Sequence, residues 1–307
     1  MNVLVGYTGF VGSNIYKHGN FDKVFNSKNI EEAYGINPDL LIYAGLPAEK
    51  YLANNFPDKD LAIIKQAKDN IKQINPKQLV LISTIDVFSD PNNVDETTPI
   101  NTSKLGAYGY NRYQLELWVR RKYPEALIIR LPALFGDNLK KNFIYDYINV
   151  IPFMLTSKKF KELSNKDSEL TKYYKIQDNG FYKLNLHEQD KEILKEKFNK
   201  LGFSAIQFTD SRNLYQFYNL QNLWKDIQKA LRLNIRLWHP ATEPISVYEL
   251  YKFLEGKSFS NNILETPLSY NFKTLYDKEF GGERGYIFTK EEMLKQIKEF
   301  IDTETQD

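Results

Sequence analysis

Short apolar runs alternate with helical patterns over the first 136 residues of the chain. The apolar runs predict strands at 3–5, 23–26, 40–43, 79–82 and 126–130. Apolar residues at helical spacing predict helices at 11–18, 60–74 and 108–123. Continuous apolar strands such as 79–82 are typical of parallel sheets that are covered by helices on both faces. The pattern therefore predicts an α/β fold, with a doubly wound parallel sheet in residues 1–136.

The chain changes character after Gly136. Residues 140–235 are rich in Lys, Asn, Phe and Tyr and are mostly helical in pattern, whereas 235–255 predicts a strand, a Pro-containing loop and a helix. A last helix is expected over 289–302, with Thr289 as its N-cap. We therefore expect a first domain over 1–136 and a smaller, mostly helical substrate-binding region over 137–307. A return of about 200–240 to the first domain is left open.

Composition excludes several classes of function. The 307 residues carry 41 Lys and Arg against 39 Asp and Glu, a net charge of +2 without a basic stripe, so neither nucleic acid nor a membrane is expected as a partner. The absence of cysteine excludes disulfides, thiolate metal sites and a cysteine nucleophile. The three histidines show no metal-ligand spacing, so no metal is expected. No signal peptide or membrane-length apolar run is recognised, and we expect a cytoplasmic protein.

A glycine-rich segment, Gly6-Tyr-Thr-Gly9-Phe10-Val11-Gly12, follows the first strand and opens the first helix. The glycines permit a tight turn, a close approach of backbone to phosphate, and close packing of the helix on the strand. The helix N-terminus offers unpaired N–H groups and a partial positive charge to a pyrophosphate. A tight turn without a ligand is the alternative, but the flanking strand and helix favour a dinucleotide-binding Rossmann domain.

The residues after the second strand bear on the choice of dinucleotide. This position carries Asn26-Ser27-Lys28, and no carboxylate occurs until Glu31. A carboxylate there is typical of NAD binding, whereas Ser, Lys or Arg suits the 2′-phosphate of NADP. The segment favours NADP over NAD, and a purely solvated Lys28 stays open.

Further motifs follow the glycines in a fixed order. They are Tyr43-Ala44-Gly45, Leu81-Ile-Ser83-Thr84-Ile85-Asp86-Val-Phe88, Tyr108-Gly-Tyr-Asn-Arg112 and Arg130-Leu131-Pro132-Ala-Leu-Phe-Gly136. Together with the glycines, they make the first 136 residues resemble the extended short-chain dehydrogenases/reductases. This NAD-dependent epimerase/dehydratase-like group includes epimerases, dehydratases and reductases of nucleotide-linked sugars.

The resemblance implies three catalytic residues. Tyr108 would be the acid/base, and the Thr84 hydroxyl would polarise the substrate carbonyl. Free tyrosine has a pKa of about 10, so such a base must be stabilised by roughly 3–4 kcal/mol to work near neutrality. The family uses a lysine four residues after the tyrosine, but this chain has Arg112. Full activity, reduced activity and cofactor binding without turnover all stay open.

The remaining cofactor residues come from the glycine segment, the turn after the second strand and the family pattern. The substrate residues come from the loops at the strand ends and from the second half, where Arg212 in an aromatic stretch would suit a nucleotide diphosphate. The cofactor-binding set is Gly6, Gly9, Phe10, Val11, Gly12, Ser27, Lys28, Tyr43, Ala44, Gly45, Ser83, Leu131 and Pro132. The expected substrate contacts are Pro47, Lys50, Asp86, Asn142 and Arg212. Dehydratases of the group carry an acidic pair after the threonine, but here Ile85 occupies the first of those positions, which argues against a dehydratase. A core role for the aromatic stretch around Arg212 and a capping role for Asp86 stay open.

The sequence thus predicts an NAD(P)-dependent oxidoreductase that reduces or epimerises a nucleotide-linked sugar. A non-catalytic or regulatory NAD(P)-binding protein is the alternative, because Arg112 replaces the usual lysine. A homodimer through the helix 108–123, using Leu115, Trp118 and Val119, and burial of these residues within one chain are equally consistent.

Overall fold

The computed structural model describes residues 1–178 and 180–305, which divide into two compact units. The first comprises Met1–Leu139, Leu214–Ser246 and Leu268–Ile297. The second comprises Lys140–Asn213, Val247–Pro267 and the residues from Lys298 onward. The first unit therefore extends beyond the boundary expected at residue 136, because two later segments return to it.

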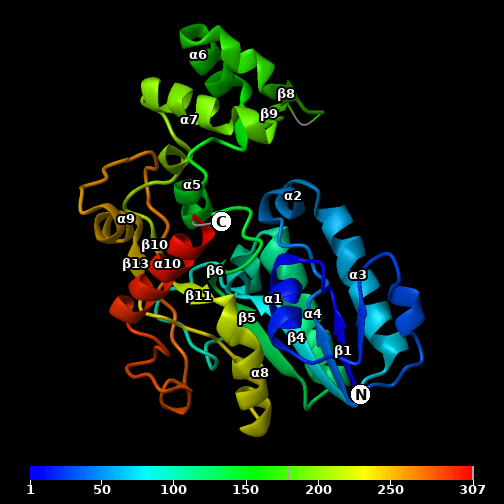
Figure 1. Cartoon of the computed structure of the whole chain (residues 1–307). Coiled ribbons are helices and arrows are strands. Elements are labelled where there is room, and N and C mark those ends of the chain that lie inside the picture. Colours follow the sequence, from blue (N-terminus) through cyan, green and yellow to red (C-terminus); the bar gives the residue numbers. More distant parts are fainter. Residues whose placement is uncertain (179, 306–307) are drawn as a thin grey trace. The chain divides into compact units, whose positions relative to one another are not determined.

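A parallel sheet forms the centre of the first unit (Figure 1). Within the described residues its six strands run in the order β12-β5-β4-β3-β1-β2. Their bounds are β1 (Asn2–Val5), β2 (Lys23–Phe25), β3 (Leu40–Tyr43), β4 (Gln78–Thr84), β5 (Leu127–Leu131) and β12 (Leu237–Trp238). Strand β1 lies between β2 and β3, and all neighbouring pairs are parallel. The predicted doubly wound α/β fold is confirmed.

Alternating strand residues form two core clusters in the first unit. The first combines Val3, Val5 and Leu41 with Ile64 of α3 (Pro57–Ile74) and Leu115 of α4 (Ala107–Lys122). The second cluster combines the residues that alternate with these along the strands with side chains of α1 (Phe10–His18) and α8 (Leu223–Arg232). Helices thus cover both faces of the sheet, as continuous apolar strands require.

The helix proposed as a dimer face contributes to the first of these cores. Leu115 and Val119 are buried there, and Trp118 packs against the same cluster half-buried. The structure therefore favours burial of this face within one chain.

Two further pairs of short strands belong to the first unit. Strand β6 (Ala133–Phe135) pairs in parallel with β11 (Phe217–Asn219), and β10 (Leu214–Tyr215) pairs antiparallel with β13 (Ile245–Ser246). The remaining helices are α2 (Lys50–Asn55) and a set of short 3-10 turns: η1 (Ile30–Ala33), η2 (Ile85–Val87), η3 (Thr102–Lys104), η7 (Leu220–Asn222) and η8 (Lys278–Phe280).

The second unit contains a small antiparallel sheet that the helical pattern did not indicate. Among the described residues it has three strands in the order β7-β9-β8, with bounds Met154–Thr156, Phe181–Leu184 and Tyr174–Ile176. Its helices are α5 (Phe143–Ile148), α6 (Ser157–Lys166), η4 (Ser168–Lys172), η5 (Glu188–Asp190), α7 (Lys191–Lys200), η6 (Ala205–Phe208) and α9 (Val247–Glu255). Leu155, Leu163, Leu194 and Phe198 form a core of its own. Strands of three or four residues are too short to show a period of two.

The last helix, α10, spans Lys290–Glu304. The Glu292 amide donates to Thr289 Oγ1 at 3.3 Å, and the Thr289 amide donates to Glu292 Oε2 at 2.8 Å. This reciprocal capping box confirms Thr289 as the N-cap. In the described part of the chain, none of the helices is long and apolar enough to cross a membrane.

A polar network is buried where β4, β5 and α4 meet. The Glu116 carboxylate accepts from Arg130 Nη2 at 2.7 Å and from the Ser83 hydroxyl at 2.6 Å. Arg130 Nη1 lies 3.3 Å from His239 Nε2, and His239 Nδ1 lies 3.2 Å from the Lys273 carbonyl. A neutral imidazole that donates from Nδ1 and accepts at Nε2 satisfies both contacts. Burial and the charge of Arg130 lower the pKa of His239 to about 3.

This pKa predicts acid sensitivity of the fold. Because the pKa of His239 is lower in the folded chain than the unfolded value of about 6.5, the unfolded state binds the proton first as the pH falls. The free energy of unfolding should fall by up to about 1.4 kcal/mol per pH unit below pH 6.5, on account of this group. Urea unfolding at a series of pH values should give a shallower acid slope for His239→Gln than for the native chain. Parallel slopes would show that His239 does not contribute.

Candidate active site

The glycine segment forms a tight turn between β1 and α1. Gly6 has a φ of +93°, and a Cβ there would lie 2.5 Å from the Ala44 carbonyl oxygen. A Cβ at Gly12 would lie 2.0 Å from the Gly6 carbonyl oxygen, so a side chain is excluded at both positions. Gly9 is the N-cap of α1, and no side chain caps this helix end. The N-terminus of α1 thus presents backbone N–H groups without a side-chain acceptor, which is the arrangement that binds a pyrophosphate.

The segment after β2 lies next to the glycine turn. The Gly6 amide donates to the Phe25 carbonyl at 2.7 Å, which places the end of β2 beside this turn. Ser27 and Lys28 follow and are exposed, and the Lys28 amide donates to Asn26 Oδ1 at 2.9 Å. This turn leaves an exposed hydroxyl and an exposed ammonium group close to the glycine segment.

Several residues of the expected cofactor set have their side chains in the core. Tyr43 is buried between the sheet and α3, where its hydroxyl accepts from Asn70 at 3.2 Å. Leu131 is buried on the other face, and Phe10 and Val11 pack against the same cluster. Tyr43 and Leu131 therefore offer at most their backbone to a ligand, whereas Phe10 and Val11 are partly exposed. Ala44, Gly45 and Pro132 also belong to the expected cofactor set, and these three residues are not buried.

Ser83 was expected to face the cofactor, but its hydroxyl donates to Glu116 in the buried network described above. Because successive side chains of a strand point to opposite faces, Ser83 and Thr84 have different surroundings. The Thr84 hydroxyl instead accepts from the Asp86 amide at 3.1 Å at the end of β4.

Tyr108 lies in the first turn of α4, and its side chain is 7% exposed. The Asn54 side chain of α2 accepts from the Tyr108 amide at 2.9 Å and so satisfies the start of this helix. Gly109 permits the close packing of α4 on η2, because a Cβ there would lie 2.2 Å from the Asp86 carbonyl oxygen. These contacts place the start of α4 beside Asp86, and the Tyr108 phenol makes a polar contact with Thr84.

Burial dominates the electrostatics of the Tyr108 phenol. It raises the pKa of Tyr108 above the ordinary value of 10, and the charge of Asp86 adds to this effect. The charge of Arg112 and polar contacts with Thr84 and Arg112 lower the pKa of the phenol, but less than burial raises it. Tyr108 is therefore protonated at neutral pH.

Arg112 is buried beneath the active-site surface and is only 3% exposed. Its Nη1 donates to both carboxylate oxygens of Asp60, at 3.0 Å each, and to the Tyr108 carbonyl at 3.0 Å. Its Nη2 donates to the Pro47 carbonyl at 2.8 Å, and its Cζ lies 3.7 Å from the centroid of the Tyr108 ring. The guanidinium group therefore holds protein groups together and lies over the tyrosine ring.

Two expected substrate contacts form an ion pair beside Tyr108. Lys50 Nζ lies 2.9 Å from Asp86 Oδ1, and the Tyr270 hydroxyl donates to the same oxygen at 3.0 Å. Burial and the charge of Asp86 raise the pKa of Tyr270. The Lys50 side chain is half exposed, so its charge remains accessible next to the buried phenol. Pro47 is exposed and belongs to the site through its carbonyl group.

Asn142 and Arg212 belong to the second unit. The Asn142 side chain accepts from the Tyr145 amide at 3.1 Å and caps α5. Arg212 pairs with buried Asp210, with Nη2 and Oδ2 at 2.8 Å, and also donates to the Leu264 carbonyl. Both side chains thus have structural partners within their own unit.

Sequence patterns did not indicate Asn54, Asp60, Gly109 or Tyr270. Asp60 and Arg112 are 52 residues apart, and Tyr270 is 184 residues from Asp86. Gly109 had a visible signal, since a glycine inside a predicted helix indicates close packing. The other three depend on tertiary contacts that no local pattern encodes.

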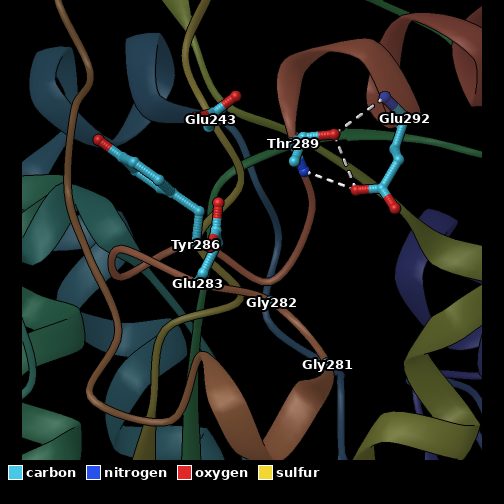
Figure 2. A pocket seen from close by; sticks show the side chains of 7 residues that line it. All are labelled: Glu243, Gly281, Gly282, Glu283, Tyr286, Thr289 and Glu292. Atoms are coloured by element: carbon cyan, nitrogen blue, oxygen red, sulfur yellow. Dashed lines mark hydrogen bonds between the residues drawn. The ribbon is translucent and has the colours of Figure 1, made fainter.

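A separate pocket of about 250 Å³ lies at the start of α10 (Figure 2). It is lined by Glu243, Gly281, Gly282, Glu283, Tyr286, Thr289 and Glu292. Glu243 accepts from the Lys290 amide, and Glu292 completes the capping box with Thr289. These carboxylates stabilise the helix start, and none of the predicted site residues lines the pocket. Among the described residues, no group of His, Asp or Glu side chains is arranged to hold a metal ion.

No protein-family model and no curated protein matches the chain. Solved structures do. A dTDP-4-dehydrorhamnose reductase from Yersinia enterocolitica has a TM-score of 0.64 at 13% identity, and the match covers 98% of each chain. The dTDP-4-dehydrorhamnose reductase from Bacillus anthracis in complex with NADP has a TM-score of 0.62 at 16% identity, again over 98% of each chain.

A third similar structure is the Bordetella bronchiseptica enzyme WbmG in complex with NAD and UDP. Its TM-score is 0.62 at 12% identity, and the match covers 99% of this chain and 94% of that chain. At these identities the likeness establishes the fold, and it agrees with the resemblance that the sequence motifs indicate. The chain has the Rossmann-type α/β fold that these enzymes share.

Proposed function

We propose that the chain is an NAD(P)-dependent enzyme that reduces a keto group of a nucleotide-linked sugar, with Tyr108 as the proton donor. The observation that carries this proposal is the buried, protonated Tyr108 next to Thr84 and Asp86, in the same unit as the glycine turn. Similar structures with this fold include reductases and a UDP-galactose 4-epimerase, so epimerisation is the nearest other reaction.

The residues present fit a dinucleotide. A Cβ at Gly6 or Gly12 would clash with nearby backbone atoms, so the turn requires glycine at both positions, and the α1 N-terminus has no side-chain cap. The backbone of Gly6, Gly9 and Gly12 would hold the pyrophosphate, and Ser27 and Lys28 would hold a 2′-phosphate. Exposed Lys28, in a stretch with no carboxylate between Asp22 and Glu31, favours NADP over NAD. When bound, the reduced dinucleotide supplies the hydride.

The side chains around Tyr108 would handle the substrate oxygen. The Thr84 hydroxyl would donate a hydrogen bond to the carbonyl oxygen, which polarises the carbonyl bond. Tyr108 Oη would give its proton to the same oxygen as negative charge develops there, and water would return the proton afterwards. Lys50 and Asp86 would contact the sugar or its phosphates. The proposed site does not include Asn142 and Arg212, because the hydrogen bonds of these side chains within the second unit give them a structural role.

A non-catalytic dinucleotide-binding protein is the second candidate. The observation in its favour is the burial of Arg112, whose Nη groups donate to Asp60, Tyr108 and Pro47. In this family pattern the residue at that position normally holds the cofactor ribose, a role that this buried guanidinium group does not support. Binding of NADPH without oxidation by any of a panel of keto-sugar nucleotides would favour this candidate.

Tyr108→Phe tests the assignment of the proton donor. We expect kcat with a keto-sugar nucleotide to fall by about 100-fold or more, because the transferred proton is lost. The Kd for NADPH, measured by fluorescence, should stay within a few-fold, since the ring remains. Tyr110→Phe is the matched control, because Tyr110 lies on the same helix and is 42% exposed. Retained activity in Tyr108→Phe would refute the assignment.

A pair of glycine variants tests the cofactor site. Gly12→Ala places a Cβ 2.0 Å from the Gly6 carbonyl oxygen, so the turn must move, whereas the Cβ of Gly9→Ala lies 3.3 Å from that oxygen. We expect Gly12→Ala to weaken NADPH binding by about tenfold or more, and Gly9→Ala to weaken it less. Circular dichroism melts should accompany the titrations, so that a loss of fold is recognised. Equal affinities in all three proteins would contradict a pyrophosphate site at this turn.

A further inference from the structure

Asp60 lies in the first turn of α3 and is 4% exposed. Its carboxylate accepts from Arg112 Nη1 with both oxygens at 3.0 Å, and Oδ2 also accepts from Asn111 Nδ2 at 2.9 Å. All three bonds come from two successive residues of α4. An acidic residue in the first turn of a helix ordinarily stabilises that helix by interacting with its dipole. The Asp60 carboxylate instead accepts hydrogen bonds from α4, the helix that carries Tyr108.

The ion pair fixes Arg112 relative to the tyrosine. With Asp60 on one side and the Pro47 carbonyl on the other, the guanidinium group lies over the ring face, with Cζ 3.7 Å from the centroid. Its bond to the Tyr108 carbonyl adds a contact to the backbone of the same residue. Asp60 also supplies a negative charge that opposes the positive charge of Arg112 at the phenol.

We propose that Asp60 is a positioning residue that holds Arg112 against the Tyr108 ring and offsets its charge, so that Tyr108 keeps its proton and serves as a proton donor. This inference rests on the proposed function, in which Tyr108 exchanges a proton with the substrate oxygen. In the reduction, the O–H bond of Tyr108 breaks, an O–H bond forms on the substrate, and a reduced dinucleotide gives two electrons as hydride. The phenolate then takes a proton from water.

The groups around the phenol agree with this role. From the elements packed on Tyr108, the polar and charged side chains are Arg112 and Asn111 of α4, Asp60 of α3, Asn54 and Lys50 of α2, Thr84, Asp86 and Tyr270. Lys50 is paired with Asp86, as Arg112 is paired with Asp60. The positive charges of Lys50 and Arg112 therefore each have a carboxylate partner, and burial remains the dominant effect on the proton.

The test needs no cofactor. The chain is labelled with [13Cζ]-tyrosine, the resonance of Tyr108 is identified by its absence from Tyr108→Phe among the 21 tyrosines, and its chemical shift is followed with pH. We expect the native phenol to ionise only above about pH 10. Asp60→Asn should lower the midpoint by about one pH unit or more, because the charge of Arg112 is then unopposed. Asp60→Glu, which keeps the negative charge, should titrate Tyr108 with the same midpoint as the native chain.

A double variant covers the case in which Asp60→Asn alone does not fold. Asp60→Asn with Arg112→Gln removes both charges, so no unpaired charge is buried. Its Tyr108 midpoint should be no lower than that of the native chain. Native ionisation of Tyr108 below about pH 9, an unchanged midpoint in folded Asp60→Asn, or a lowered midpoint in the double variant would each overturn the proposal. A merely structural role for Asp60 leaves the titration unchanged.

Kinetics separate this inference from the proposed function. If the chain turns over a keto-sugar nucleotide, the alkaline limb of the kcat/KM profile for reduction should move to lower pH in Asp60→Asn, together with the Tyr108 midpoint. If no substrate of the panel is reduced, the proposed function fails, and the titration still decides whether Asp60 sets the state of Tyr108.

Discussion

The buried ion pair between Asp60 and Arg112 is the interaction on which the candidate site depends. Both side chains are nearly inaccessible, at 5% and 3%, so their charges are removed from water and must be satisfied within the protein. Asn111 donates a further hydrogen bond to the Asp60 carboxylate, and the backbone carbonyls of Tyr108 and Pro47 accept hydrogen bonds from the Arg112 guanidinium group. Breaking such a pair on one side costs about 3–5 kcal/mol, so α3 and α4 are held in one arrangement. The orientation of Tyr108 follows from it.

The segment after β3 links this pair to the glycine turn. Ala44 lies so close to Gly6 that no side chain fits between them, and Pro47, three residues later, accepts a hydrogen bond from Arg112. The same short stretch therefore contacts both the turn that would hold phosphates and the helix that carries the proton donor. A change in the Asp60–Arg112 pair is thus expected to affect the cofactor half of the site as well as Tyr108.

Local patterns were sufficient for five strands of the parallel sheet and for α1, α3 and α4, because continuous apolar strands and helical spacing are properties of neighbouring residues. They left open whether the segment with α8 and β12 returns to the first unit. They also predicted the tight glycine turn between a strand and a helix. The motif residues Thr84, Asp86 and Tyr108 lie at the end of β4, in η2 and at the start of α4. The surroundings of individual side chains were not predictable in this way. Tyr43 and Ser83 belong to the family motifs, yet in the interior the Tyr43 side chain contacts Asn70 and the Ser83 side chain contacts Glu116.

The role of Arg112 shows this limit most clearly. From the sequence it was a substitute for a lysine, with its partners unknown. Arg112 and Asp60 are 52 positions apart in the sequence, so no local pattern indicates their contact. Because of this contact, the guanidinium group that was expected to bind the ribose instead holds the tyrosine. Likewise, the small sheet of β7, β8 and β9 was not predicted, because its strands have only three or four residues and are flanked by Lys-rich helices.

A crystal structure of the chain with NADP and a nucleotide sugar would show directly whether Tyr108 serves the cofactor held at the glycine turn. We expect the pyrophosphate at the N-terminus of α1 beside Gly6, Gly9 and Gly12, with the nicotinamide ring and the sugar next to Tyr108 and Thr84. We also expect Arg112 to remain paired with Asp60. A dinucleotide bound elsewhere, or a nicotinamide ring remote from Tyr108, would refute the proposed site.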